Sequence, residues 1–315
     1  MTPVKLALNA MATRFELVLH GENATRLRAA GEQALKEVER LEAQLSLYRP
    51  TSEIARVNAS AAREPVRVSP SVFRLLQHAR QLQSETGAAF DITVAPLVRC
   101  WGFMHGTGRV PEPDEIEAAR TRSGMAHVIL DEDNYSVRFD QEGVMIDLGA
   151  IGKGYAIDCA AETLREAGVT CALLHGGTST VCGIGAPPGA DGWKIAIAPA
   201  PDQPPRQIAV VLRDNALSVS AVWGKSFEAG GKKFGHVIDP RTGWPVNNAV
   251  QAAVVLPSAT ETDALSTALL VMGLEGHDSI SRLRPDMRTM VVAPAEKGFR
   301  VQARGIEIPG SCSRQ

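Results

Sequence analysis

Hydrophobic and polar residues follow two different periods along this chain. Across residues 23–45, apolar side chains recur every three or four positions with charges between them, which is the pattern of an amphipathic helix. Asn23 or Thr25 is suited to cap its start. A second helix is predicted over residues 69–86, because Gly87 then provides a common helix end. Further helices are predicted at residues 53–58, 113–121 and 260–272.

Shorter apolar segments follow the two-residue period of strands. Residues 6–20 predict a strand pair or a strand with a turn, and residues 127–130 and 136–140 predict a hairpin. Because several strands follow one another without a helix between them, the sequence predicts an α+β fold with a largely antiparallel sheet and packed helices. We expect a single domain over residues 1–315, in which no linker marks a boundary between subdomains. The other predicted strands are residues 169–175, 193–198, 208–212, 217–220, 234–238, 249–256, 289–293 and 298–303.

The composition is that of a globular protein, with 44% hydrophobic and 22% charged residues among 315. A formal charge of −2 and dispersed basic residues argue against binding to nucleic acid or to an anionic membrane. No apolar run is long enough to predict a membrane span. The first residues lack the features of a signal peptide, so we expect a cytoplasmic protein, or a periplasmic or exported one if a leader was removed. The five cysteines have neither zinc-site spacing nor the spacing of a disulfide framework.

Residues 147–158 combine three glycines, a lysine and two acids. The apolar residues 143–146 precede them and an amphipathic pattern follows, which predicts a strand, a glycine-rich turn and a helix start. Backbone N–H groups at a helix N-terminus attract phosphate, and Lys153 adds a positive charge. The glycine spacing matches neither the dinucleotide fingerprint nor the P-loop. A tight strand-to-helix connection with a solvated lysine therefore explains the segment equally well.

Three further residues have side chains suited to chemistry. Asp263 and Thr267 share one face of the predicted helix over residues 260–272, and a carboxylate with a hydroxyl suits Mg²⁺, which then binds substrate phosphates. On pattern alone, an acidic residue that offsets the helix dipole is the simpler interpretation. His236 lies within the predicted strand at residues 234–238, before an Asp-Pro turn, and is either a candidate general base or a structural histidine.

Two irregular segments hold other candidates. Tyr48 could stack on an aromatic ligand, and Asp91 could bond a ribose or an exocyclic amine. Both segments also have structural explanations. The first is explained as a helix end, and the second as a buried strand over residues 90–97.

Taken together and in this order, these segments resemble the FAD:protein FMN transferase family, the ApbE-type flavin transferases. The resemblance runs from about Met11 to about Gly273, and seven ordered blocks are far more specific than any single one. The matching blocks are Met11-Ala12-Thr13, residues 46–48 with 52–54, residues 87–93, residues 147–158, Gly176-Gly177, residues 236–240 with 242–243, and residues 262–267.

The resemblance implies an α+β fold with a flavin-binding cleft, and it implies FAD as substrate with Mg²⁺ as cofactor. The implied reaction transfers the FMN half of FAD through a phosphoester bond to a Ser or Thr hydroxyl of an acceptor flavoprotein, releasing AMP. Some family members instead hydrolyse FAD to FMN and AMP, so an FAD pyrophosphatase is one alternative. A flavin-binding protein that has lost catalysis is another.

The family's functional positions carry over to this chain residue by residue. Asp263 and Thr267 match side-chain metal ligands, and the carbonyl of Ala150 matches a backbone ligand. Lys153 would help neutralise the phosphates, and His236 matches the base that deprotonates the acceptor hydroxyl. The positions that the resemblance places around FAD are Met11, Tyr48 (against the adenine), Asp91, Gly177 and Thr178.

Two segments depart from the family pattern. Thr178 stands where the family usually has Asp or Asn, and residues 218–225 replace a run that usually resembles Ser-Gly-Ser-Tyr-Glu-Arg. Both segments are expected to flank the flavin or the acceptor. They therefore bear on acceptor choice and transfer efficiency, while FAD and metal binding are still expected.

Overall fold

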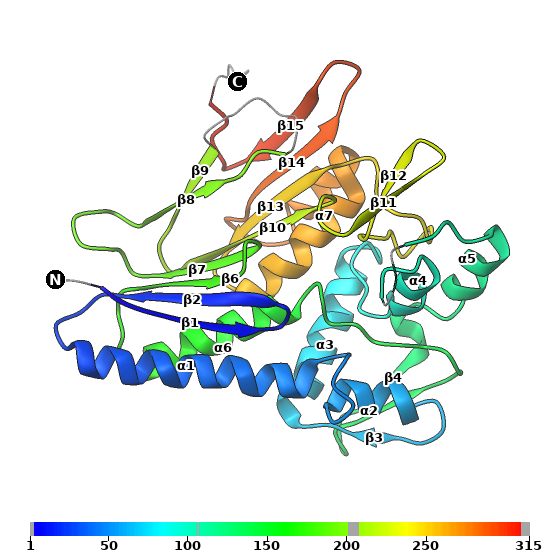
Figure 1. Cartoon of the computed structure of the whole chain (residues 1–315), viewed down its shortest axis with the longest axis horizontal. Helices are drawn as coiled ribbons and strands as arrows, with labels where there is room; N and C mark the ends of the chain where they lie inside the picture. Colours follow the sequence, from blue (N-terminus) through cyan, green and yellow to red (C-terminus); the bar gives the residue numbers. More distant parts are fainter. Residues whose placement is uncertain (1–2, 105, 107, 201–207, 310–315) are drawn as a thin grey trace. The chain divides into compact units, whose positions relative to one another are not determined.

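The computed structural model describes residues 3–104, 106, 108–200 and 208–309 (Figure 1). Contacts between residues group the chain into two compact units, each built from separate stretches of sequence. Unit 1 comprises Met1–Arg40, Lys153–Ser220 and Asn248–Gln315, and unit 2 comprises Leu41–Gly152 and Ala221–Asn247. That the whole chain forms a single domain stays a prediction.

Unit 1 is built on an eight-stranded sheet with the order β1-β2-β6-β7-β10-β13-β14-β15. The pairs β1/β2, β2/β6, β6/β7, β7/β10, β13/β14 and β14/β15 are antiparallel. The prediction of an α+β fold with a largely antiparallel sheet is therefore confirmed. The strands are β1 Val4–Ala10, β2 Thr13–Leu19, β6 Ala172–Gly176, β7 Thr180–Ile184, β10 Asn215–Ala221, β13 Gln251–Leu256, β14 Arg288–Pro294 and β15 Phe299–Arg304.

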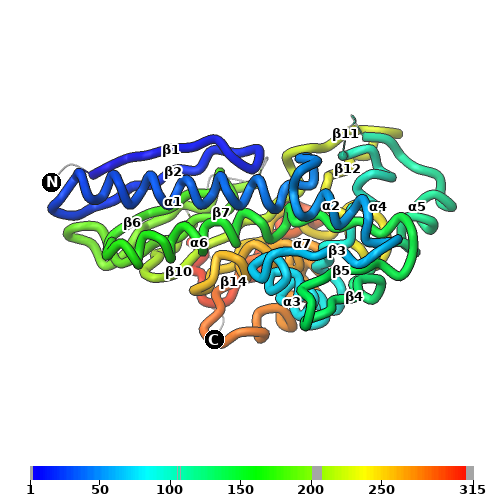
Figure 2. The backbone as a smooth tube through the Cα atoms, turned by 90° about the horizontal axis from the view of Figure 1, so that it is seen from below, coloured from blue at the N-terminus to red at the C-terminus, as the bar shows by residue number. Residues whose placement is uncertain are grey.

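Three helices cover one face of this sheet (Figures 1 and 2). Strand pairing identifies the face, because residues paired across strands point to the same side. Phe15 pairs with Gly176, which pairs with Thr180, and Thr180 pairs with Ser218. Ile157 packs directly on this face at Gly176. The helices are α1 (Ala24–Leu45, of which the last turn belongs to unit 2), α6 (Gly152–Glu166) and α7 (Ala259–Ile280).

The opposite face of the sheet packs against the antiparallel hairpin of β8 (Trp193–Ile197) and β9 (Ile208–Leu212). Strand β13 is buried along its whole length because it has a helix on one side and this hairpin core on the other. Burial on both faces explains its apolar run from Ala252 to Leu256. The hairpin core consists of Val181, Trp193, Ile197, Ile208, Val210, Leu212, Leu217, Ala253, Val255, Met290, Val292 and Ile306.

Unit 2 contains helices, two small sheets with the orders β3-β5-β4 and β11-β12, and an aromatic core around Trp101. Trp101 is fully buried, donates its indole N–H to the Gly243 carbonyl at 2.8 Å, and packs against Phe234 and Trp244. The elements are α2 Glu53–Ser60, β3 Val66–Arg67, α3 Pro70–Glu85, α4 Ala95–Cys100, α5 Pro113–Arg120, the 3₁₀ turn Met125–His127, β4 Val128–Asp131, β5 Ser136–Phe139, β11 Ser226–Ala229 and β12 Lys232–Gly235.

Two segments predicted as strands are not strands. Residues 143–146 pair with no strand, because the Asn58 side chain bonds both the N–H and the C=O of Ile146, at 2.8 and 2.9 Å. Residues 90–97 turn around Asp91 and enter α4, since the Asp91 carboxylate accepts the Thr93 N–H at 2.8 Å. In both cases a side chain satisfies backbone groups that a strand would pair with a neighbour.

Three strands, β3, β7 and β11, were not predicted, and one predicted strand ends earlier than expected. Strand β3 has only two residues. Strands β7 and β11 are short and contain Thr, Ser or Gly, which weakens their apolar alternation. Strand β12 ends at Gly235, so His236 follows the strand and does not lie within it. The site histidine is therefore in a loop.

The described part of the chain contains no disulfide and no helix suited to span a membrane. None of the helices there is both long and apolar enough to cross a membrane. Cys100, Cys159, Cys171 and Cys182 are free thiols, and Cys312 lies outside the described residues. Burial raises the pKa of Cys159 to about 11 and that of Cys182 to about 12, so both stay protonated at neutral pH.

The buried imidazole of His277 should make the folded protein less stable in acid. It is 2% exposed on α7, with Nε2 3.0 Å from the Thr289 hydroxyl and Nδ1 3.6 Å from Asp278 Oδ1. Burial lowers the pKa of this imidazole, so the unfolded chain binds the proton first as pH falls below about 6.5. The neutral His277 side chain therefore contributes its full stability to the folded protein above that pH, and this contribution is lost as the pH falls further.

The His277→Gln variant should therefore lose less stability than the wild type between pH 7 and pH 5. The difference in slope should be at most about 1.4 kcal/mol per pH unit, the limit for one proton. Urea unfolding at several pH values measures it. Parallel pH curves for the two proteins would contradict this account of His277.

Candidate functional site

The starts of helices α6 and α7 are joined in unit 1. The Asp158 carboxylate accepts the N–H groups of Ala259 and Thr260 at 2.8 and 2.9 Å, and the hydroxyls of Ser258 and Thr260 at 2.8 and 2.6 Å. A carboxylate at this position also offsets the positive end of the α7 dipole. Gly154 permits the close approach, because a Cβ there would lie 2.2 Å from the Ala259 carbonyl oxygen. We refer to this contact as the α6–α7 junction.

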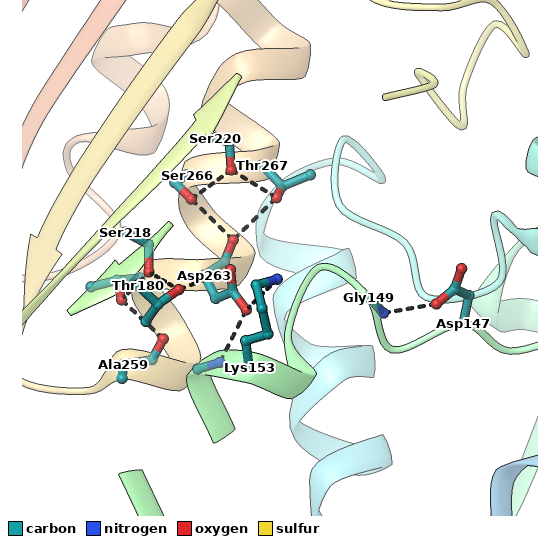
Figure 3. A network of polar contacts seen from close by, with 12 residues as sticks. Asp147, Gly149, Lys153, Thr180, Ser218, Ser220, Ala259, Asp263, Ser266 and Thr267 are labelled. Carbon is teal, nitrogen blue, oxygen red and sulfur yellow. Dashed lines mark hydrogen bonds and ion pairs between the residues drawn. The ribbon is translucent and has the colours of Figure 1, made fainter. Parts of the chain in front are cut away.

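The junction places the Asp263 carboxylate beside the glycine-rich start of α6 (Figure 3). Its side chain is 5% exposed, and Oδ2 accepts the Gly154 N–H at 3.0 Å. The Lys153 ammonium lies 3.7 Å from the same oxygen, while the Thr180 hydroxyl lies 3.5 Å from Oδ1. A carboxylate held away from water needs positive charge nearby. Here the Lys153 ammonium and the Gly154 N–H supply it.

Hydroxyl groups extend this site along α7 (Figure 3). Thr267 and Ser266 both donate to the backbone carbonyl of Asp263, at 3.1 Å each. Ser220, from β10, lies 2.8 Å from the Ser266 hydroxyl oxygen and 3.1 Å from that of Thr267. Asp263 and Thr267, the two side chains predicted to bind metal, are therefore one helical turn apart in an oxygen-rich setting.

Three other predicted residues lie in two adjacent turns of the unit 1 sheet. Met11 is in the turn between β1 and β2, and Gly177 and Thr178 are in the turn between β6 and β7. The Gly177 N–H donates to the Arg14 carbonyl at 3.0 Å, so the two turns lie side by side. Gly177 has φ +69°, and a Cβ there would lie 2.1 Å from the Thr13 hydroxyl oxygen. The fold itself therefore requires glycine at position 177.

The turn that leads into α6 belongs to unit 2. Asp147 Oδ1 accepts the Gly149 N–H at 2.8 Å, and the Gly152 N–H donates to the Leu148 carbonyl at 2.7 Å. Ala150 is half-buried between these two bonds. It is assigned to a different unit from the other two predicted metal ligands, so its role as a backbone ligand stays a prediction.

Asp91 and Tyr48 also lie in unit 2, in contrasting surroundings. Asp91 is 6% exposed, and its Oδ1 accepts the N–H and the hydroxyl of Thr93 at 2.8 and 2.6 Å. Burial raises the pKa of the Asp91 carboxyl, although these hydrogen bonds oppose the rise. Tyr48 is 59% exposed. Its ring is therefore accessible to a ligand, whereas the Asp91 carboxylate is engaged by its own loop.

The ring of His236 is held by a backbone carbonyl in unit 2. The His236 N–H donates to the Lys225 carbonyl oxygen at 3.1 Å, and Nδ1 lies 3.2 Å from the same oxygen. Because a carbonyl oxygen only accepts hydrogen bonds, Nδ1 carries the hydrogen and Nε2 holds the lone pair. This tautomer allows Nε2 to act as a general base.

The side chains of unit 1 fit a hard divalent cation. Asp263 supplies a carboxylate and Thr267 a hydroxyl, and Mg²⁺ prefers oxygen ligands of this kind. Among the described residues, no group of three or more His, Cys, Asp or Glu side chains could hold a metal ion. A cation at Asp263 would therefore take further ligands from a substrate, as Mg²⁺ does with phosphate oxygens.

Sequence reasoning did not identify the roles of Asp158, Gly154 and Ser220. A signal was present for the first two, because they are four residues apart on one face of α6 inside the glycine-rich segment. Their partner, the first turn of α7, is about a hundred residues away in sequence. Ser220 has no motif, and only the sheet register brings it to α7.

Known proteins resemble this chain over most of its length. A model of the ApbE family matches residues 11–291. An FAD:protein FMN transferase of Vibrio cholerae is 32% identical over 274 residues, covering 84% of this chain and 80% of that protein. One from Escherichia coli K12 is 29% identical over 282 residues, covering 86% of this chain and 79% of that protein.

Solved structures give the same result. The ApbE protein of Thermotoga maritima has a TM-score of 0.84 and 28% identity, covering 96% of both chains. The apo form of the flavinyl transferase ApbE of Pseudomonas stutzeri has a TM-score of 0.83 and 26% identity, covering 96% of this chain and 95% of that chain. The fold of the described residues is therefore the fold of these proteins.

The close approach of the two helices at Gly154 should be visible in the unfolding free energy. Gly154→Ala should lower the unfolding free energy by about 2 kcal/mol or more, because the added methyl group would overlap the Ala259 carbonyl. Gly152→Ala is the matched control, since its Cβ would meet Leu148 Cβ at an ordinary 3.7 Å. The control should change the unfolding free energy by less than about 0.5 kcal/mol. Urea unfolding compares the two, and equal effects would refute the close-approach argument.

Proposed function

The chain belongs to the ApbE family, and from this premise we propose that it transfers the FMN half of FAD to a hydroxyl group of an acceptor flavoprotein. The observation that carries the proposal is the buried Asp263 carboxylate beside Lys153 at the glycine-rich start of a helix. Such a site suits a divalent cation and a pyrophosphate together. FAD contains a pyrophosphate between its FMN and AMP halves.

Lys153 and the start of α6 account for recognition of the phosphates. The Lys153 side chain is 24% exposed, so its ammonium can contact Asp263 and still reach a ligand. The positive end of the α6 dipole has the same sign as this ammonium. Both features favour an anion at the junction.

Asp263 and Thr267 would hold Mg²⁺, with the Ala150 carbonyl as a proposed backbone ligand. When bound, Mg²⁺ supplies positive charge that offsets the charge developing on the pyrophosphate oxygens and on the AMP leaving group. Oxygen side chains also accept Mn²⁺, so we expect Mn²⁺ to substitute for Mg²⁺.

The reaction is an in-line displacement at the FMN phosphorus. The acceptor hydroxyl oxygen forms a new bond to phosphorus while the bond from phosphorus to the AMP oxygen breaks. The hydroxyl proton passes to Nε2 of His236, which the hydrogen bond from Nδ1 to the Lys225 carbonyl keeps available as a base. With water in place of the acceptor, the same steps hydrolyse FAD to FMN and AMP.

The remaining proposed contacts are to the nucleotide. We assign Tyr48 to stacking on the adenine because its ring is exposed. Met11, Gly177 and Thr178 are assigned to the flavin because their two turns are adjacent. Asp91 is assigned a supporting role around FAD, since its carboxylate is engaged with Thr93.

Incubation with FAD and Mg²⁺ tests the proposed reaction, with and without a flavoprotein that has an exposed Ser or Thr acceptor segment. AMP is measured by chromatography and the acceptor by intact mass spectrometry. We expect AMP together with an acceptor mass increase equal to bound FMN, and loss of both when EDTA removes the metal. AMP without a mass increase would indicate a pyrophosphatase, and no AMP despite bound FAD would indicate a flavin-binding protein.

His236→Ala separates catalysis from binding. Transfer should fall by about 100-fold or more because the general base is lost, while FAD affinity in a calorimetric titration should be unchanged. His127→Ala is the matched control, since His127 pairs with Asp140 on the surface of the same unit, at 3.0 Å. Lost FAD binding in the His236 variant, or equal loss of transfer in the control, would contradict the assigned role.

A further inference from the structure

Three hydroxyls form a compact group at the end of β10 and on α7. We call Ser220, Ser266 and Thr267 the outer trio (Figure 3). Ser220 approaches the other two from the sheet, at 2.8 and 3.1 Å, and these two approach the Asp263 carbonyl at 3.1 Å each. Ser220 lies in the segment 218–225, which departs from the family pattern. It has no role in the reaction proposed above.

The outer trio has fewer hydroxyl hydrogens than short oxygen–oxygen contacts. Four oxygen–oxygen distances fall between 2.8 and 3.1 Å, whereas three hydroxyls carry three hydrogens. Thr267 and Ser266 each give their hydrogen to the Asp263 carbonyl. Ser220 then has one hydrogen for two neighbours, and Ser266 is the closer. The Ser220 and Thr267 oxygens consequently face each other at 3.1 Å with lone pairs on both.

A cation resolves this shortage, and the spacing suits it. Octahedral Mg²⁺ holds oxygens at 2.0–2.1 Å, so two adjacent ligands lie about 3.0 Å apart. The Ser220 and Thr267 oxygens are 3.1 Å apart and both residues are half-buried, so a ligand can reach them. Thr267 is already a proposed metal ligand, one turn of α7 from Asp263.

A neighbouring group provides the contrast. The inner trio of Thr180, Ser218 and Thr262 is fully buried. It too has more contacts than hydrogens, because its three hydroxyls take part in four contacts of 2.9, 2.9, 3.2 and 3.5 Å. A shortage of hydrogens alone therefore does not single out the outer trio. Its accessibility and the position of Ser220 next to Thr267 do.

We infer that the Ser220 hydroxyl is an additional oxygen ligand for the divalent cation, adjacent to Thr267. The inference rests on the proposed function, because that function brings the cation to this site. It assigns a binding role to a residue of the divergent segment. It also predicts that metal affinity depends on β10 as well as on α7.

The test measures Mn²⁺ binding by loss of the free-ion electron paramagnetic resonance signal, at saturating FAD and without acceptor. Ser220→Ala should weaken Mn²⁺ binding about tenfold. FAD affinity in EDTA should be unchanged for this variant. Ser218→Ala, two residues earlier on the same strand and face, is the matched control and should retain wild-type Mn²⁺ affinity. Unchanged Mn²⁺ affinity in Ser220→Ala, or equal losses in the two variants, would overturn the inference.

Ser220→Cys provides a second readout that a packing role would not give. A sulfur ligand favours soft metals, so the ratio of Cd²⁺ to Mn²⁺ affinity should rise about tenfold or more over wild type. An unchanged ratio would overturn the inference. Wild-type protein that binds FAD but no Mn²⁺ would instead contradict the proposed metal dependence, so the two failures are distinguishable.

Discussion

The close approach of α6 to the first turn of α7 is the constraint on which the unit 1 site depends. Gly154 has no Cβ to separate the helices, and Asp158 supplies acceptors for four hydrogen-bond donors at the α7 start. The same contact aims the Gly154 N–H at Asp263 and brings Lys153 beside it. One junction therefore holds a helix N-terminus, an ammonium and a carboxylate together, which is what binding a metal and a pyrophosphate requires.

In the proposed reaction, the residues of the two units would have different roles. Unit 1 supplies fixed charges and oxygen atoms, held by buried strands and by a long buried helix that keeps its conformation up to Gly273. Unit 2 supplies a histidine in a loop, whose tautomer is set by the Lys225 carbonyl. Metal and phosphate binding need rigid positions, whereas a base that meets a second protein must be accessible. These different needs account for the positions of the proposed groups. The metal ligands lie on a helix, and the proposed base lies in a loop.

The sequence predicted most of the fold because its helices and most of its strands have regular apolar spacing. It failed where a side chain replaced a strand as hydrogen-bond partner, as Asn58 does for Ile146. At the site, residue type and spacing made Asp263, Thr267 and Lys153 candidates beside simpler structural interpretations, and the same holds for His236. The family resemblance supplied the roles proposed for them. Asp158 and Ser220 could not be found in this way, because their roles arise from contacts between segments far apart in the chain.

The central claim is that the cation binds beside Asp263 at the α6–α7 junction. A crystal grown with FAD and Mn²⁺ tests it most directly, by anomalous diffraction at the manganese edge. The account predicts a single strong peak within bonding distance of the Asp263 carboxylate and the Thr267 hydroxyl, in contact with the FAD pyrophosphate. Bound FAD with manganese elsewhere, or with no manganese, would contradict it.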